Sequence, residues 1–239
     1  MNNFFFIGLP YLVIAIFLIG TIFKYIYTSY KYSTLSSQLL EDNTLFYGTR
    51  PFHWGIMFLF TGHLTGLLFP SSVLAWNGQT MRLLIIEIAA FGFALTTLYG
   101  LTILIFRRLL NKRIKIVTSK MDYVVYIILL IQIISGLWVA YFHRWGTSWF
   151  ASVMSPYLKS VLLFSPDTAA VNIAPLSVKI HIISAFSIIG IVPFTRLVHF
   201  LVYPFRYFYR GYILVIWNRN QRKMRVSANM REGKKPRNN

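Results

Sequence analysis

Long apolar runs separated by short polar stretches dominate this sequence, and no alternating barrel-like pattern or internal repeat interrupts them. Five runs are long enough to cross about 30 Å of hydrocarbon as helices of about 20 residues. Backbone polar groups in lipid must be satisfied within the segment, so we expect helices. The pattern predicts an all-α integral membrane protein, a bundle of five transmembrane helices. The runs are Phe4–Tyr27, Phe52–Leu74, Leu83–Phe106, Tyr123–Phe142 and Val178–Tyr203.

Composition agrees with a membrane protein and weakens the case for a nucleic-acid partner. The chain is 56% hydrophobic and 18% aromatic with a mean hydropathy of +0.57, outside the range of soluble domains. Its net charge of +18 would normally suggest nucleic-acid binding. The basic residues gather in the loops and the tail, however, where membrane topology and anionic lipid account for them. We therefore expect membrane lipid as a partner and no nucleic acid.

Loop charge predicts the orientation of the bundle. Of the 24 lysines and arginines, 20 fall on one side of the predicted membrane and four on the other. Basic loops stay in the cytoplasm, which places the N-terminus outside and the C-terminus inside the cell. The N-terminal run has neither a basic leader nor a small-residue cleavage site, so we interpret it as a retained span. The prediction is a multi-pass protein of the cell membrane.

We expect two regions along the chain. Residues 1–209 form the five-helix membrane domain, and residues 210–239 form a basic cytoplasmic tail. Two interpretations of the tail have equal weight: a disordered cationic segment on anionic lipid, or a docking arm for a cytoplasmic partner.

Cysteine is absent from the chain. This excludes disulfides, Fe–S ligation by this chain, thiolate metal sites and covalent haem attachment. A redox cofactor would have to be held by histidine or methionine, and an Fe–S relay would belong to a partner.

Four of the five histidines lie inside apolar runs: His53 and His63 in the second, His181 and His199 in the fifth. Ionisable side chains at bilayer depth are costly and usually functional. Hydrogen bonding between helices can explain a single such histidine, but explains two matched pairs poorly. A b-type haem needs two axial imidazoles from opposite sides, which two facing helices supply. The pattern therefore predicts two bis-histidine haem sites.

The predicted topology pairs the histidines by depth. His53 and His199 form an inner pair, and His63 and His181 an outer pair. The spacings of ten and eighteen residues correspond to unequal rises of about 15 Å and about 27 Å. Eighteen residues are five turns, which would put His181 and His199 on one helix face. The unequal rises require helix tilt or a kink, which Pro193 can supply.

Other polar residues and glycines near the four histidines have two interpretations each. Gly55, Gly62 and Gly66 serve either close helix packing or the approach of a porphyrin edge, and we favour the second around His63. His143 ends the fourth run and is expected to be an interfacial histidine, with a proton-acceptor role as the alternative. Arg50 and Arg196 belong either to the basic inner loops or to haem propionates.

The motifs resemble the cytochrome b gamma subunit of membrane-bound respiratory nitrate reductase over nearly the whole chain. The stretches that carry this resemblance are Ser36–Leu40, Phe52–Ile56, Phe60–His63 with Gly66 and Pro70, Arg107–Arg108, Ile131–Gln132 with Gly136–Leu137, Ile180–His181 and Pro193–His199 with Pro204. The resemblance implies five transmembrane helices and two b haems on His53, His199, His63 and His181.

The resemblance also implies that menaquinol or ubiquinol is oxidised near the outer haem. Electrons would then pass to a cytoplasmic Fe–S subunit and to a molybdenum-cofactor subunit that reduces nitrate. A candidate quinol site comprises Gly62, His63 and Arg82. The family's site can include a lysine in the loop between the second and third helices. That loop has none here, and Arg82 is the nearest cation.

Three alternatives remain open. Related di-haem anchors serve other quinone-linked complexes, of the heterodisulfide, sulfite-reducing or nitrite-oxidising type. A transporter with a histidine proton relay would need acidic residues at depth and internal repeats, and only Glu87 is a candidate acid. A purely structural membrane scaffold would leave the four histidines unexplained.

Overall fold

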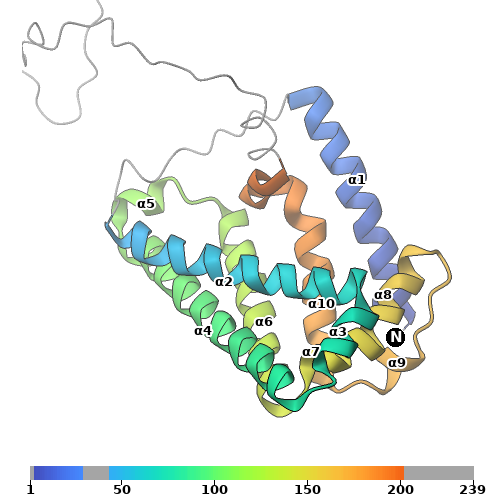
Figure 1. Ribbon diagram of the computed structural model, residues 1–239. Coiled ribbons are helices and arrows are strands. Elements are labelled where there is room, and N and C mark those ends of the chain that lie inside the picture. The colour runs from blue at the N-terminus through green and yellow to red at the C-terminus, as the bar shows by residue number, and fades with distance from the viewer. Residues whose placement is uncertain (1–2, 29–42, 202–239) are drawn as a thin grey trace, which may run out of the picture. The chain divides into compact units, whose positions relative to one another are not determined.

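The computed structural model describes residues 3–28 and 43–201, and these residues form helices and no strand (Figure 1). The bundle contains four long helices, α1 (Leu9–Thr28), α2 (Asn43–Leu68), α4 (Thr80–Leu110) and α6 (Lys120–Phe142), and the shorter α10 (Leu176–Ile191). A π-helical turn (Phe4–Gly8) leads into α1. The connections form α3 (Pro70–Asn77), α5 (Lys112–Ile116), α7 (Gly146–Trp149), a π-helical turn (Phe150–Met154), α8 (Ser155–Leu162) and α9 (Ala169–Ile173).

The helices agree with the predicted membrane bundle. Within the described residues, four segments are long and apolar enough to cross a membrane: Phe4–Tyr27, Thr80–Leu110, Lys120–Phe142 and Leu176–Phe194. The bent pair of α2 and α3 makes a fifth if it is counted as one span. The all-helical fold class is therefore confirmed, with four to five spans. The boundary at 209/210 and the basic tail lie outside the described residues.

The second predicted span, Phe52–Leu74, is wrong as one straight helix. Its helix already begins at Asn43 and ends at Leu68, and the chain turns by 106° into α3. Phe69 has φ −125° and ψ 55°, and Pro70 opens the next helix. A residue before proline is disfavoured in the helical region, so the break falls at Phe69.

The fifth predicted span, Val178–Tyr203, is also wrong as one continuous helix. The α-helix ends at Ile191, and two 3₁₀ turns follow, Val192–Phe194 and Arg196–Val198, separated by the extended residue Thr195. Proline lacks a backbone N–H and clashes with the preceding turn, which accounts for a break at Pro193. His199 therefore follows a broken segment and does not share a regular helix face with His181.

Close packing of α2 on α4 depends on small residues. A Cβ atom on Gly55 would collide with Thr97, and one on Gly100 would collide with the backbone of Phe52. Small residues allow membrane helices to approach in this way. Gly55 thus serves helix packing. A Cβ atom on Gly62, by contrast, would meet no heavy atom within 4 Å, so that glycine borders open space.

The connection between α6 and α10 folds into a cover that packs on the start of the chain. Val161, Val171 and Val178 form a buried cluster with Phe6. Tyr157, 2% exposed, donates its hydroxyl to the carbonyl oxygen of Phe6 at 2.8 Å. Burial raises the pKa of Tyr157 to about 12, so the phenol remains a neutral donor. The loop is therefore an ordered part of the fold.

Candidate functional site

The structure brings the four intramembrane histidines together in two pairs. The ring centres of His53 and His199, the inner pair, lie 6.1 Å apart with planes inclined by 69°. The ring centres of His63 and His181, the outer pair, lie 6.3 Å apart with planes inclined by 37°. Each pair joins α2 to α10 or to the segment that follows it. Both pairs form despite the unequal spacings, and the helix break after Ile191 lies between His181 and His199.

These separations fit the ligand set of a bis-histidine haem. Metal–imidazole bonds are about 2 Å long, and each ring centre lies about 1 Å behind its nitrogen, which gives roughly 6 Å between the two centres. In the described part of the chain, no three His, Cys, Asp or Glu residues gather into a metal site. Two protein ligands suffice for a haem iron, because the porphyrin supplies the other four.

Three of the four rings are oriented by backbone carbonyls. The Nδ1 atoms of His53, His63 and His199 lie 2.8, 2.7 and 2.7 Å from the carbonyl oxygens of Thr49, Leu59 and Arg196, respectively. A ring that donates its Nδ1–H in this way keeps the lone pair of Nε2 for a metal.

His181 is held by two residues of α6. Its Nδ1 atom lies 3.1 Å from both the carbonyl oxygen of Gln132 and the hydroxyl of Ser135. Its Nε2 atom lies 3.1 Å from the side-chain nitrogen of Gln132. The side-chain oxygen of Gln132 accepts a hydrogen bond from the Ser184 hydroxyl. His181 therefore carries its proton on Nδ1, as the other three histidines do. Iron binding to Nε2 requires the Gln132 amide to turn away.

An ionic network lies beside the inner pair. Asp122, 7% exposed, accepts from Arg108 and from Arg196, each at 3.0 Å. Arg196 also donates to the carbonyl oxygen of Val117 at 3.0 Å, and its own carbonyl accepts from His199. Asp122 therefore ties the segment carrying His199 to the start of α6 and the end of α4. With these contacts, Arg196 has a structural role.

Sequence reasoning did not predict that Gln132 and Ser135 contact His181. It also did not predict the ion pair of Asp122 with Arg108. One local signal was available: Ser119 and Asp122 form a capping box at the start of α6, with Ser119 N donating to the carboxylate at 2.9 Å. That signal marks a helix start. It carries no information about the two arginines, because they come from distant parts of the chain.

The candidate quinol residues lie in two places. Gly62 and His63 are exposed on α2, and the ring centre of Phe150, from the connection between α6 and α10, lies 5.1 Å from that of His63. Arg82 lies instead with its guanidinium 4.8 Å from the indole centre of Trp76. Gly66 packs against Phe150, where a Cβ atom would come within 2.8 Å of the ring. Of the three glycines, Gly62 is therefore the one beside which a porphyrin edge has room.

Two further polar residues have local partners. The guanidinium of Arg50 lies 4.3 Å from the ring centre of Phe46, one turn earlier on α2. Glu87 accepts hydrogen bonds from the backbone N–H and the hydroxyl of Thr147, at 2.8 and 2.7 Å. The acid on which a transporter would depend thus anchors the connection between α6 and α10.

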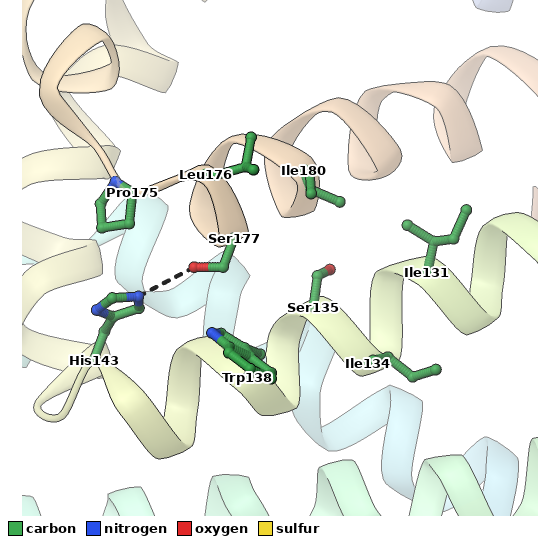
Figure 2. A pocket seen from close by; sticks show the side chains of 9 residues that line it. All are labelled: Ile131, Ile134, Ser135, Trp138, His143, Pro175, Leu176, Ser177 and Ile180. Carbon is green, nitrogen blue, oxygen red and sulfur yellow. Dashed lines mark hydrogen bonds between the residues drawn. The ribbon is translucent and has the colours of Figure 1, made fainter.

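A groove of about 540 Å³ runs between α6 and α10 (Figure 2). Its walls are mostly apolar, and His143 and Ser177 lie at one end, with His143 Nε2 3.1 Å from the hydroxyl of Ser177. Ser135, the partner of His181, lies in the wall. His143 directly follows α6, as expected of an interfacial histidine.

Comparisons with known proteins agree with this architecture. The family model described as nitrate reductase gamma subunit matches residues 2–218. The chain is 31% identical to the nitrate reductase gamma chain of Bacillus subtilis over 209 residues, which cover 86% of this chain and 94% of that protein. It is 29% identical to the respiratory nitrate reductase 2 gamma chain of Escherichia coli over 218 residues, 90% and 96% of the two chains. The chain is also 30% identical to the nitrate reductase-like protein NarX of Mycobacterium tuberculosis. That match covers 90% of this chain and 34% of NarX.

Proposed function

This chain belongs to the nitrate reductase gamma subunit family, and from that premise we propose that it is the membrane cytochrome b of a respiratory nitrate reductase. In this role it oxidises quinol near the outer face of the cell membrane. The electrons pass through two b haems to a cytoplasmic Fe–S subunit and then to a molybdenum-cofactor subunit. The orientation, N-terminus outside and C-terminus inside, rests on the loop charges.

The observation that carries the proposal is the pairing of the rings at 6.1 and 6.3 Å. We assign His53 and His199 as ligands of the inner haem iron, and His63 and His181 as ligands of the outer one. Bound haem supplies one-electron redox chemistry. The protein fixes the tautomer of each ligand, which leaves the lone pair of Nε2 for iron.

Family membership also supports this function over the alternatives. Among di-haem anchors, the relatives named above are nitrate reductase chains or nitrate reductase-like, which favours this complex over heterodisulfide-type, sulfite-reducing or nitrite-oxidising ones. A transporter is disfavoured because Glu87 is engaged with Thr147. The proposed function includes quinol binding at Gly62, His63 and Arg82, where exposed Gly62 precedes His63 of the outer pair.

The test is a reduced-minus-oxidised spectrum of the purified complex, combined with haem extraction and protein quantification. We expect two non-covalent b haems per chain, both reduced when a quinol is added. Nitrate added afterwards should reoxidise them. A complex without haem absorbance would overturn the assignment, and haems that nitrate leaves reduced would overturn the proposed acceptor.

A further inference from the structure

The connection between α6 and α10 exposes three successive apolar side chains at the end of α8. Leu162, Leu163 and Phe164, here called the apolar tip, are 58%, 75% and 82% exposed. Charged residues flank the tip on both sides, Lys159 before it and Asp167 after it. Exposed apolar side chains that gather in one place generally mark a surface that meets lipid or another protein.

Contacts with α1 show where the apolar tip lies. Near the start of α8, the Tyr157 hydroxyl donates to the carbonyl oxygen of Phe6. Beyond the end of α8, the ring of Phe164 stacks on that of Tyr11, with centres 5.5 Å apart and planes inclined by 6°. The helix α8 therefore follows the first turns of α1 in the direction from Phe6 to Tyr11 (Figure 1). Both contacts fall within Phe4–Tyr27, a segment apolar enough to cross a membrane.

The charge pattern of α1 indicates the depth of Tyr11 in the membrane. The first charged side chain of the sequence is Lys24, and the twenty residues from Phe4 to Phe23 are uncharged. At about 1.5 Å per residue these residues span about 30 Å, the thickness of the hydrocarbon core. Tyr11 comes seven residues after Phe4, which is about 10 Å along the helix. Phe164, stacked on Tyr11, is thus at a depth of about 10 Å in a membrane that α1 spans.

The backbone of the apolar tip is suited to hydrocarbon, where an unpaired N–H group is costly. The N–H groups that follow Leu162 are all paired with carbonyl oxygens of α8: Leu163 with Lys159 at 2.9 Å, Phe164 with Val161 at 3.2 Å, and Ser165 with Ser160 at 3.0 Å. Residue 166 is a proline, which has no N–H group. The chain then turns back, since the N–H of Asp167 donates to the Ser160 hydroxyl at 2.9 Å.

Phe164 has a backbone conformation that phenylalanine rarely adopts. Its φ is 58°, in the left-handed region. The bonds from Phe164 to Val161 and from Ser165 to Ser160 form a Schellman motif, in which glycine usually fills this position. A bulky side chain there costs energy, and such strain persists where the surroundings compensate for it. Transfer of the exposed ring into hydrocarbon is a compensation that water does not offer.

We propose that the apolar tip inserts among the acyl chains of one membrane leaflet and anchors the connection between α6 and α10 to the bilayer. Lys159 and Asp167 then lie on the head-group side of the tip. The tip continues the lipid-facing surface of α1, where Leu12, next to Tyr11, is also exposed. A water-soluble subunit does not reach this depth, whereas acyl chains do. The anchor is independent of haem and quinol binding.

The test uses the full-length chain in lipid nanodiscs. Because the chain has no cysteine, a nitroxide label attaches only to an introduced one. Phe164→Cys and Leu163→Cys place the label at the tip. Leu12→Cys is the reference for the same depth on α1, and Arg144→Cys, beyond the end of α6, is the reference for water. Power-saturation electron paramagnetic resonance measures collisions with oxygen, which concentrates in hydrocarbon, and with a water-soluble nickel chelate. We expect both tip labels within about 5 Å of the depth of the Leu12→Cys label, one helical turn.

A second variant tests the ring itself. Phe164→Gly keeps the left-handed backbone, which glycine adopts without strain, and removes the apolar side chain. Combined with Leu163→Cys, it should shift the label toward the membrane surface, and an unshifted label would contradict an anchoring role for Phe164.

Two other results would overturn the proposal. Tip labels that the nickel chelate reaches as readily as the Arg144→Cys label would place the tip in water. Few collisions with either reagent would mean that protein covers the tip, such as a second copy of the chain. The haem content of the same samples tests the proposed function separately.

Discussion

The inner and outer histidine pairs are alike in ring separation but are held in place by different chemistry. At the inner pair, His199 follows a broken helix, and its segment is fixed by the buried carboxylate of Asp122 between Arg108 and Arg196. At the outer pair, His181 lies in the regular part of α10 and is held by the neutral groups of Gln132 and Ser135.

The difference follows from the backbone around each ligand. A regular helix already satisfies its backbone groups, so His181 needs only a few neutral contacts to orient its ring. The segment after Pro193 has lost that regularity, and ion pairs tie it to α4 and α6 instead. Buried charges are tolerated when they are paired and hydrogen-bonded, as Asp122 is. The inner pair should therefore be sensitive to the loss of one charge, and the outer pair should not.

Removal of a ligand should produce the largest effect. We expect His181→Ala to lose about half of the b-haem absorbance and to keep the inner haem, because the iron loses one of two axial bonds. His199→Ala should lose the other half. Reduced-minus-oxidised spectra and redox titration of the purified complex distinguish the two.

His143→Ala is the matched control, since it removes the one histidine that lies outside the two pairs, and it should keep both haems. Two haems surviving His181→Ala would contradict the assigned outer pair.

Loss of the Asp122 charge should be the next largest effect. Asp122→Asn leaves two arginines without their carboxylate, and breaking a buried ion pair costs roughly 3 kcal/mol. We expect faster loss of haem on heating, with the inner haem lost first. Absorbance melting of the purified complex, followed at the bands of each haem, measures this.

Asp167→Asn is the corresponding control. Asp167 lies in a loop, where its carboxylate accepts a hydrogen bond from the backbone of Ala169. The substitution should change stability by less than about 0.5 kcal/mol. Equal effects of the two substitutions would mean that Asp122 does not stabilise the inner pair specifically.

The predictable part of this structure depends on local information. Apolar runs predicted the helices, and loop charge together with run order predicted which histidines would face each other. The bend at Phe69 lay within reach, since the next residue is a proline. The prediction of a straight span ignored that signal in favour of continuous hydropathy.

The network at Asp122 was beyond such reasoning. Ser119 and Asp122 predict a helix start locally, but Arg108 and Arg196 reach the carboxylate only through the packing of α4, α6 and the final segment. Gln132 and Ser135 are likewise polar residues in an apolar run, and periodicity does not reveal which neighbour they contact. Local patterns predict elements, whereas the partners of buried polar groups depend on tertiary packing.

A smaller effect is expected at the carboxylate of Glu87, which contacts the connection between α6 and α10. Glu87 accepts only from the amide and hydroxyl of Thr147 among the contacts described, so Glu87→Gln keeps an acceptor oxygen and loses only the contribution of the charge. We expect a loss of about 1 kcal/mol in stability and no change in either haem. Thermal melting of Glu87→Gln and Asp122→Asn side by side compares their losses of stability. Equal losses would contradict the expected difference between the Glu87 contact and the Asp122 network.

The smallest effect is expected in the potential of the outer haem. Ser135→Ala removes one of the two oxygen acceptors near His181 Nδ1 and leaves the carbonyl of Gln132 in place. A weaker hydrogen bond at Nδ1 makes the imidazole a poorer donor to iron, so the potential should rise, by about 30 mV. Ser187→Ala is the matched control, because the Ser187 hydroxyl donates to the carbonyl of Ile183 within α10. Redox titration without quinol should show the outer haem shifted in Ser135→Ala, the inner haem unshifted, and neither shifted in Ser187→Ala. A shift of the inner haem would mean that the two pairs are coupled through the bundle and are not held independently.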